Sequence, residues 1–295
     1  MRFLIALLLV TNLSCSSVSF NYKLIEPWTS VGQKNEPYQS VFIAKFQKNN
    51  KSLNYIAANH SNDIESATFK TIKKAMDELS PEVIILEGFS SDEGINPKGM
   101  IRHGERCLKS KFSNCGEPAY AIHLANQLEI PFIGAEPSDL AIMKEMVNKG
   151  YTVLDIAGFY LLRQIPQLKR QGKLKSLKDF PEQAESSLRS NSKRLGLKTN
   201  ISFSSFKSWY NDNNKTNKSF YDFDSNDAAP IQDGSYFQQI SSKIGFVREN
   251  GINKIIEEKV HEYSNVLVVY GAGHLVKSRK LYEDYFGKAK HIKWF

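Results

Sequence analysis

Short apolar runs that alternate with helix-like segments constrain the fold of this chain more than any other feature. The runs have the length of buried strands, and the stretches between them carry apolar residues at helical spacing. Strand followed by helix, repeated along a chain, forms a parallel sheet with helices on its faces. We therefore expect an α/β fold with a mainly parallel, mixed sheet that is flanked by helices. The runs are 53–58, 83–86, 131–134 and 265–270.

The first of these strands is expected to pair with an earlier one. Residues 39–46 alternate apolar and polar side chains, and the polar turn 47–52 links them to the run 53–58, which predicts a hairpin. The helix that follows is expected to start at Asn62, with Glu65 three residues later completing a capping box.

The middle of the chain differs from its two ends. From about 163 to 226 it is rich in Lys, Ser and Asn and has no strand-like run, so we expect a helical insertion laid over the sheet as a cap. Residues 38–295 as a whole are expected to form a single domain. After the insertion, 235–262 should be a long helical region that is broken or kinked near Gly251. Aromatic side chains of the insertion should pack the cap onto the core or line a pocket; they are Phe203, Phe206, Trp209 and Tyr210.

Residues 1–19 have the layout of a secretory signal peptide. A basic start at Arg2 precedes the unbroken apolar run Phe3 to Val10, which is too short to span a bilayer. Cys15 ends a lipobox-like stretch and is then the lipid-bearing first residue of the mature protein. Ordinary cleavage after Ser19 is the alternative, and we favour the lipid anchor. Both hypotheses predict export to the periplasm or the cell surface.

Two further expectations depend on export. Residues 20–37 are polar and irregular and are expected to form a tether. Cys107 and Cys115 then lie in an oxidising compartment, where such a pair forms a structural disulfide. Their spacing matches no zinc-binding signature, which argues against a metal role for them.

The net charge of +8 is spread along the chain, with some concentration between Lys169 and Lys198. A basic balance can indicate nucleic acid or anionic lipid as a partner. The sequence carries no nucleic-acid recognition motif, however. We interpret the basic segment as a solvated helical face, and we expect no nucleic-acid partner and membrane contact through the lipid anchor only.

Each of the four expected parallel strands is followed by a reactive side chain. His60 follows the first strand, Glu87 the second, Glu136 the third and His274 the fourth. The carboxyl ends of parallel strands lie along one edge of the sheet, and ligands bind in the crevice outside that edge. These groups are therefore expected to meet in space although they are far apart in the sequence.

Two histidines and a carboxylate are a common catalytic metal set that leaves a coordination position for water. We expect His60, Glu87 and His274 to bind a divalent metal of the Zn or Mn type. Glu117 and Glu136 are the candidates for a general base or for partners of the ligands. Taken singly, each of these residues is also explained by a helix cap or an ion pair, and the shared edge is what favours a functional site.

Short motifs surround these positions in a fixed order along the chain. They are Ile56-Ala57-Ala58-Asn59-His60, Ile85-Leu86-Glu87-Gly88, Gly116-Glu117-Pro118-Ala119-Tyr120, Gly134-Ala135-Glu136-Pro137, Arg248-Glu249 and Tyr270-Gly271-Ala272-Gly273-His274. Together they resemble the TraB/Tiki group, which is related to the GumN proteins and more distantly to the erythromycin esterases and the ChaN-like haem-binding lipoproteins. The resemblance covers roughly 53–140 and 236–286.

The resemblance implies an α/β protein whose site is formed by the two histidines and Glu87, with Arg248 stabilising an anion or orienting the substrate. Some Tiki members are metal-dependent proteases, and the esterases open a lactone. The chain departs from the family pattern at Ala57, where the family has glycine, and at Glu249, where it has aspartate. A Cβ at position 57 is expected to crowd a close backbone approach.

Three functions remain open. The first is metal-dependent hydrolysis of a peptide or ester bond in a peptide or small-molecule substrate. The second is ligand binding without catalysis by an envelope lipoprotein, with haem or another small molecule as ligand, and the third is an inert interaction protein. Other enzyme classes lack their signatures, since the sequence has no G-x-S-x-G elbow, Walker A loop or H-E-x-x-H pair, and Val276 stands where a dinucleotide-binding loop needs its third glycine.

Overall fold

The computed structural model describes residues 19–30, 41–112, 115–174, 176–178, 180–198 and 200–295. Within these residues the centre of the protein is a six-stranded sheet with the order β4-β3-β5-β2-β1-β6. The middle strands run parallel, whereas β1 is antiparallel to both of its neighbours. The α/β fold with a mainly parallel, mixed sheet is therefore confirmed. The strands are β1 (Phe42–Lys48), β2 (Lys51–Ala58), β3 (Val83–Ser90), β4 (Phe132–Glu136), β5 (Asn265–Gly271) and β6 (Lys290–Ile292).

The expected hairpin is present, but the helix after it starts later than expected. Residues 42–48 pair in antiparallel register with 51–57. The next helix begins only after its N-cap Ser66, so the predicted start at Asn62 is wrong. The reason is local, because Asp63 Oδ1 accepts a hydrogen bond of 2.9 Å from the backbone N–H two residues later. Such a side-chain turn competes with helix formation.

The central strand β5 is buried on both faces of the sheet. It pairs with β2 on one side and with β3 on the other. Because successive side chains of a strand point to opposite faces, Val266, Val268 and Tyr270 join one apolar cluster, while Leu267 and Val269 join another. This double burial explains why β5 has the longest unbroken apolar run among the strands.

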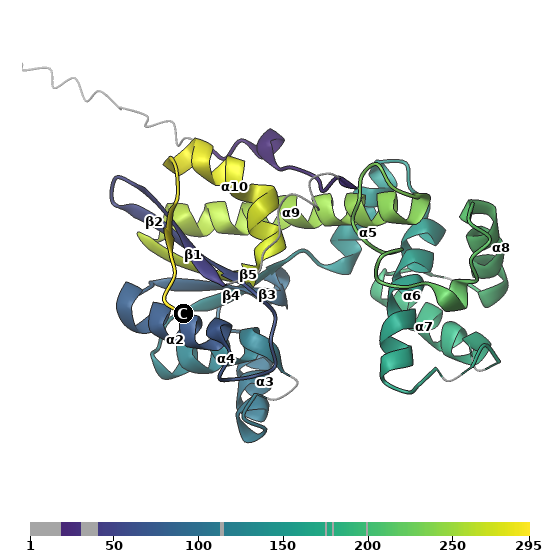
Figure 1. Cartoon of the computed structure of the whole chain (residues 1–295), viewed down its shortest axis with the longest axis horizontal. Coiled ribbons are helices and arrows are strands. Elements are labelled where there is room, and N and C mark those ends of the chain that lie inside the picture. Colours follow the sequence, from purple (N-terminus) through teal and green to yellow (C-terminus); the bar gives the residue numbers. More distant parts are fainter. Residues whose placement is uncertain (1–18, 31–40, 113–114, 175, 179, 199) are drawn as a thin grey trace, which may run out of the picture.

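Helices cover both faces of the sheet and give three layers (Figure 1). The face that holds Tyr270 is covered by α9 and α10, and the face that holds Val269 by α2, α3 and α4. The helices are α2 (Ala67–Leu79), α3 (Lys98–Lys109), α4 (Gly116–Gln127), α9 (Tyr236–Glu262) and α10 (Ala272–Phe286).

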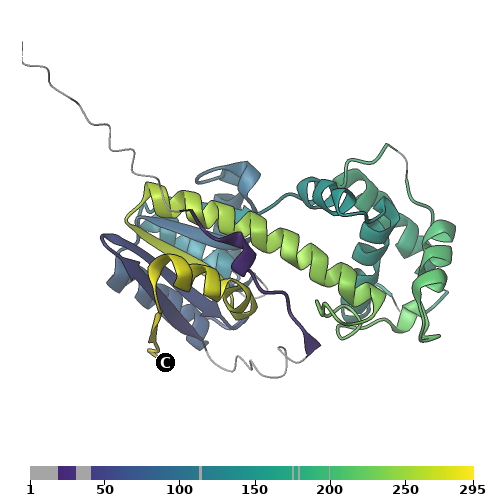
Figure 2. The ribbon, with the colours of Figure 1, turned by 90° about the horizontal axis from the view of Figure 1, so that it is seen from above.

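A separate group of helices, the helical lobe (residues 139–247), lies beside the sheet (Figures 1 and 2). It has its own apolar core, in which Trp209 of α8 packs edge-on against Phe237 of α9. The insertion is helical as predicted, and it extends beyond the predicted bounds 163–226. It lies beside the sheet rather than over one of its faces, and its aromatic side chains pack on one another. Its helices, besides the first half of α9, are α5 (Asp139–Asn148), α6 (Val153–Arg170), α7 (Phe180–Arg194) and α8 (Phe203–Asn213).

The long helix α9 joins the helical lobe to the sheet (Figure 2). Its residue Ile244 lies in the core of the helical lobe, and Ile256 lies in the core next to the sheet. The helix is continuous, so the predicted break near Gly251 is wrong. Gly251 serves packing instead, because a Cβ at this position would lie 3.0 Å from Pro137 Cγ.

The described N-terminal residues pack against the sheet. Phe20 and Ile25 are buried in the core on the α9 side, and Glu257 of α9 accepts a hydrogen bond of 2.6 Å from the N–H of Phe20. The predicted tether at 20–37 is therefore wrong for residues 20–30, because apolar side chains hold this stretch on the domain.

The predicted signal peptide, with Cys15, lies outside the described residues except for Ser19. The part of the predicted tether from 31 to 37 lies outside them as well. Among the helices that the structure describes, none is both long and apolar enough to cross a membrane.

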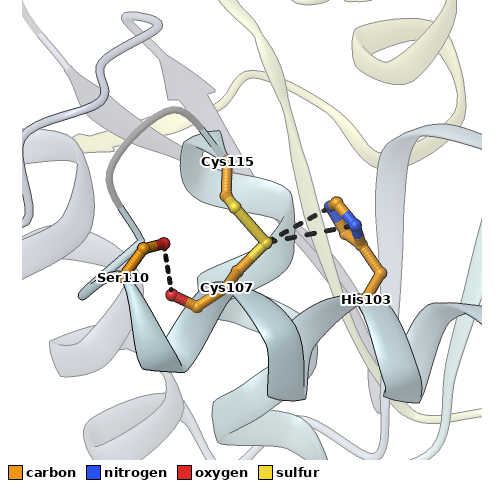
Figure 3. Close-up of a disulfide and its surroundings, with 4 residues drawn as sticks. All are labelled: His103, Cys107, Ser110 and Cys115. Carbon is orange, nitrogen blue, oxygen red and sulfur yellow. Dashed lines mark hydrogen bonds between the residues drawn. A yellow bond between two sulfur atoms is a disulfide. The ribbon is translucent and has the colours of Figure 1, made fainter.

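The expected disulfide joins Cys107 at the end of α3 to Cys115 just before α4 (Figure 3). The two Cα atoms are 5.9 Å apart. His103 lies one turn before Cys107 on α3, and its Nε2 is 3.7 Å from Cys107 Sγ. The bond closes the loop between α3 and α4, which pack against each other at the periphery of the domain.

Candidate functional site

Glu87 is the central residue of the candidate site, at the carboxyl edge of the sheet. It follows the last residue of β3 that pairs with β5. Its Oε2 accepts a hydrogen bond of 2.7 Å from the N–H of Gly271, where β5 ends and α10 begins. Its Oε1 lies 3.4 Å from His274 Nε2, and its Oε2 lies 4.0 Å from His60 Nε2. The carboxylate thus stands between two imidazoles from opposite ends of the chain.

His274 is held on its other side by a buried ion-pair network. Its Nδ1 lies 2.7 Å from Glu249 Oε1, and the same oxygen accepts a hydrogen bond of 3.0 Å from Lys277 Nζ. His274 and Lys277 are three residues apart on α10 and therefore share a face of that helix. Glu249 comes from α9 and is only 1% exposed, so its charge depends on these two partners.

His60 is held in a similar way by Glu117, from the first turn of α4. His60 Nδ1 forms a hydrogen bond with Glu117 Oε1. Because an ionised carboxylate only accepts hydrogen bonds, Nδ1 carries the proton in this pair. Glu117 is 4% exposed, whereas the His60 side chain is 65% exposed. The ring is therefore fixed at Nδ1, while the rest of it faces solvent.

The carboxylates shift the pKa values of both histidines. Burial lowers the pKa of His274, but Glu249 and Glu87 outweigh burial and raise it to about 9. The hydrogen bond with Glu117 raises the pKa of His60. Burial raises the pKa of Glu87, yet His274, the Gly271 N–H and His60 outweigh it and bring the pKa to about 2. Each charge in the site is thus stabilised by an opposite one beside it.

Two small residues near the site have different roles. A Cβ on Gly271 would lie 2.9 Å from His60 Nε2 and 3.4 Å from Glu87 Oε2, so any larger residue here would displace the His60 ring from its present position. Ala57, which we expected to crowd the site, is fully buried in the apolar cluster that also contains Tyr270. In this structure the backbone that comes close to His60 and Glu87 is that of Gly271.

Glu136 and Arg248 form a second pair at the same edge. Arg248 Nε and Nη2 donate to the two carboxylate oxygens of Glu136 at 2.9 and 2.8 Å. Burial lowers the pKa of Arg248, but Glu136, Glu249 and Glu87 outweigh burial and raise it. Because both of its oxygens are engaged, Glu136 is a weaker candidate for a general base than the sequence suggests.

A cleft of about 520 Å³ opens between the sheet edge and the helical lobe. Glu87 lines this cleft and also contacts both imidazoles, so it connects the two parts of the site. Charged and polar side chains make up most of the lining, and they are Glu87, Ser90, Glu136 and Arg248 on the sheet side and Ser138, Asp139, Tyr160, Arg163, Gln164, Gln167 and Arg194 on the side of the helical lobe.

The histidines and Glu87 are close but not yet within the spacing of a formed metal site. Among the described residues, one group of three ligand-type side chains has all its ligand atoms within 4.8 Å of one another, and it is His103 with Cys107 and Cys115. Both of these sulfurs are engaged in the disulfide. His60, Glu87 and His274 do not form such a group when each residue is counted by one ligand atom.

Sequence reasoning identifies most of this site and misses part of it. His60, Glu87, His274 and Glu117 are brought into contact as expected, and the pair of Glu136 with Arg248 lies at the same edge. The sequence does not identify three basic residues of the site and its cleft, which are Lys277, Arg163 and Arg194. The spacing of Lys277 from His274 is a usable signal, whereas the two arginines are placed at the cleft only by the packing of the helical lobe.

No family model, curated protein or solved structure matches the chain.

Proposed function

We propose that the protein is a hydrolase of peptide or ester bonds that uses a divalent metal ion of the Zn or Mn type. The ligands are His60, Glu87 and His274. One observation carries the proposal: each imidazole has its Nδ1 next to a buried carboxylate, at 2.7 Å from Glu249 for His274, and has its Nε2 on the side of Glu87. Metal-bound histidines in proteins have this arrangement, in which a second carboxylate fixes the ring and the tautomer.

The three side chains suit such an ion because of their donor atoms and because neighbouring residues hold them in position. Imidazole nitrogen and carboxylate oxygen are the donors that Zn²⁺ and Mn²⁺ take in catalytic sites. When bound, the ion supplies a Lewis acid and lowers the pKa of a water molecule. A shared ion requires His60 Nε2, now 4.0 Å from Glu87 Oε2, to come closer to it, and the 65% exposure of the His60 side chain leaves room for that shift.

The other residues position the ligands and the substrate. Glu117 orients His60, while Glu249, whose charge Lys277 balances, orients His274. The N–H of Gly271 fixes one oxygen of Glu87. Arg248 lies at the wall of the cleft, where its guanidinium orients a carbonyl or stabilises the negative charge that develops on its oxygen.

Two further points favour hydrolysis over haem binding. The cleft beside Glu87 is lined mostly by charged and polar side chains, which suits a polar substrate better than a large apolar macrocycle. The resemblance of the site motifs to the TraB/Tiki group, which has metal-dependent proteases among its members, points in the same direction.

Metal binding by purified protein tests the proposal. The protein is stripped of metal and titrated with Zn²⁺ and with Mn²⁺ in a calorimeter, and hydrolysis of peptide and ester substrates is assayed with the metal that binds. We expect one ion per chain for the unchanged protein and at least a hundredfold weaker binding for His60→Ala and for His274→Ala, with no remaining turnover.

His291→Ala is the matched control, because His291 is exposed and contacts Arg279 outside the site. This variant should bind metal and turn over substrate as the unchanged protein does. Absence of stoichiometric binding in the unchanged protein, or full binding in both site variants, would contradict the proposal. A visible absorption band of the protein as purified would instead support the haem-binding alternative.

A further inference from the structure

Most charges that line the cleft are already paired. Arg248 bonds to both oxygens of Glu136, as described above. Arg194 Nε lies 2.8 Å from Asp139 Oδ2, and the Arg194 guanidinium also lies over the ring of Tyr160 at 5.1 Å from its centroid. These two arginines are thus held in place at the cleft wall and are neutralised by one carboxylate each.

Arg163 is the cation of the cleft that has no carboxylate partner within the described part of the chain. It is exposed and lines the same cleft as Arg194 and Arg248. The walls of the cleft displace water from its guanidinium, which lowers the pKa of Arg163, and the positive charges of Arg248 and Arg194 lower this pKa further. A guanidinium that faces two others without a counter-ion creates a local positive potential, which a bound anion relieves.

The face of α6 toward the cleft suits an acidic ligand. Tyr160, Arg163, Gln164 and Gln167 have the spacing i, i+3, i+4, i+7, so they form one stripe on the helix, and all of them line the cleft. The planar guanidinium of arginine matches the two oxygens of a carboxylate or a phosphate, and the glutamine amides can donate further hydrogen bonds.

We propose that the cleft binds an acidic group, a carboxylate or a phosphate, through Arg163. The positive charges of Arg194 and Arg248 add to the electrostatic attraction of this group to the cleft. The acidic group belongs to the substrate, and it anchors the molecule on the side of the helical lobe while the bond to be cleaved reaches Glu87. The assignment to a substrate rests on the proposed hydrolase function. The binding of the anion itself needs neither a metal nor turnover.

Calorimetric titration with small probes tests the site. The protein is titrated with succinate, with inorganic phosphate and with succinamide, which is the neutral counterpart of succinate, at one constant low ionic strength. We expect at least one of the two anions to bind about tenfold or more tightly than succinamide. Tighter binding of succinate identifies a carboxylate ligand, and tighter binding of phosphate identifies a phosphate ligand.

Variants on one helix locate the binding. Arg163→Gln should weaken binding of the preferred anion at least about tenfold, since a charge-assisted bidentate contact is lost. Arg163→Lys should retain part of the affinity. Arg170→Gln is the matched control, because Arg170 is an exposed arginine of α6 that does not line the cleft, and its affinity should not change.

The same titrations separate this proposal from the hydrolase proposal. The His274→Ala variant should lose metal binding and keep its affinity for the anion. Two results would overturn the inference: an unchanged protein that binds neither anion better than succinamide, or an Arg163→Gln variant that binds the anion as the unchanged protein does. Circular dichroism of Arg163→Gln should show an unchanged fold, because the side chain is exposed.

Discussion

At the scale of single residues, the backbone of Gly271 is the tightest point of the candidate site. Substituting Gly271→Ala introduces a Cβ 2.9 Å from His60 Nε2. The exposed ring of His60 can move aside, so we expect the free energy of unfolding to change by less than about 1 kcal/mol. The displaced ring no longer faces Glu87, and we expect at least tenfold weaker metal binding by calorimetry.

Gly273→Ala provides the comparison two residues later. A Cβ at Gly273 meets Trp28 Cζ2 at 3.6 Å, which is an ordinary contact, so metal affinity should stay as it is. Equal metal affinities of the two variants would mean that Gly271 is not required for the position of His60.

At the scale of elements, the glycines of α9 are expected to respond in opposite ways. Gly251→Ala places a Cβ 3.0 to 3.2 Å from the rigid ring of Pro137, so we expect a loss of about 1 kcal/mol or more in the free energy of unfolding. At Gly245→Ala the nearest atom is the flexible Lys277 Nζ at 3.7 Å, and the higher helix propensity of alanine should add about 0.5 to 1 kcal/mol. Urea unfolding of both variants measures the difference, and a shift of the same sign in both would contradict the packing role of Gly251.

Asp155 joins three helices of the helical lobe. It is 5% exposed, and its Oδ1 accepts hydrogen bonds of 2.7 Å from Trp209 Nε1 of α8 and from the Tyr236 hydroxyl of α9. Its Oδ2 accepts bonds from Thr152, the N-cap of its own helix α6. We expect Asp155→Asn to lower the free energy of unfolding by about 2 kcal/mol at neutral pH, as measured by urea unfolding.

The effect of Asp155→Asn should depend on pH with a definite sign. Burial raises the pKa of Asp155, but the bonds from Tyr236, Thr152 and Trp209 outweigh burial and lower it below the ordinary value. The stabilisation is therefore complete above the unfolded pKa of about 4 and is lost as the pH falls through the folded pKa. The difference in the free energy of unfolding between the unchanged protein and Asp155→Asn should therefore shrink below about pH 4. Asp212→Asn, at an exposed position of α8, should leave stability nearly unchanged at every pH.

At the scale of the whole molecule, the packed N-terminus limits how far a lipid anchor can reach. Four residue steps separate Cys15 from Ser19, whose hydroxyl donates to Glu257, and they span at most about 14 Å. A lipid on Cys15 would therefore hold the domain close to the membrane surface. We propose that the mature protein is anchored in this way.

Expression of the full chain in a bacterium tests the anchor. Mass spectrometry of the mature N-terminus should show a lipid-modified Cys15, and the protein should partition into detergent. Cys15→Ala should move the protein to the soluble fraction. A mature chain that begins at Phe20 and carries no lipid would favour ordinary signal-peptide cleavage.

The sequence predicts well what depends on local pattern. The strand runs and the hairpin follow from alternation and turn composition, and the position of His60, Glu87 and His274 at one edge follows from parallel strand order. The disulfide, which the structure contains, follows from the expectation of two cysteines in an oxidising compartment. The sequence predicts less well the features that depend on contacts with residues far away in the chain. Gly251 resembles a helix breaker until Pro137 is seen beside it, and residues 20–30 resemble a tether until Phe20 and Ile25 are seen in the core.

The sequence by itself determined the mixed α/β sheet and the set of side chains that reach its carboxyl edge, because strand and helix periodicity are local properties of the chain. Only the tertiary structure decided which carboxylate supports which imidazole, and which arginine of the cleft lacks a partner. Such contacts join residues that are far apart in the sequence, 57 positions for His60 and Glu117 and 112 positions for Arg248 and Glu136. No local pattern encodes the packing of α4 and α9 against the sheet that brings these pairs together.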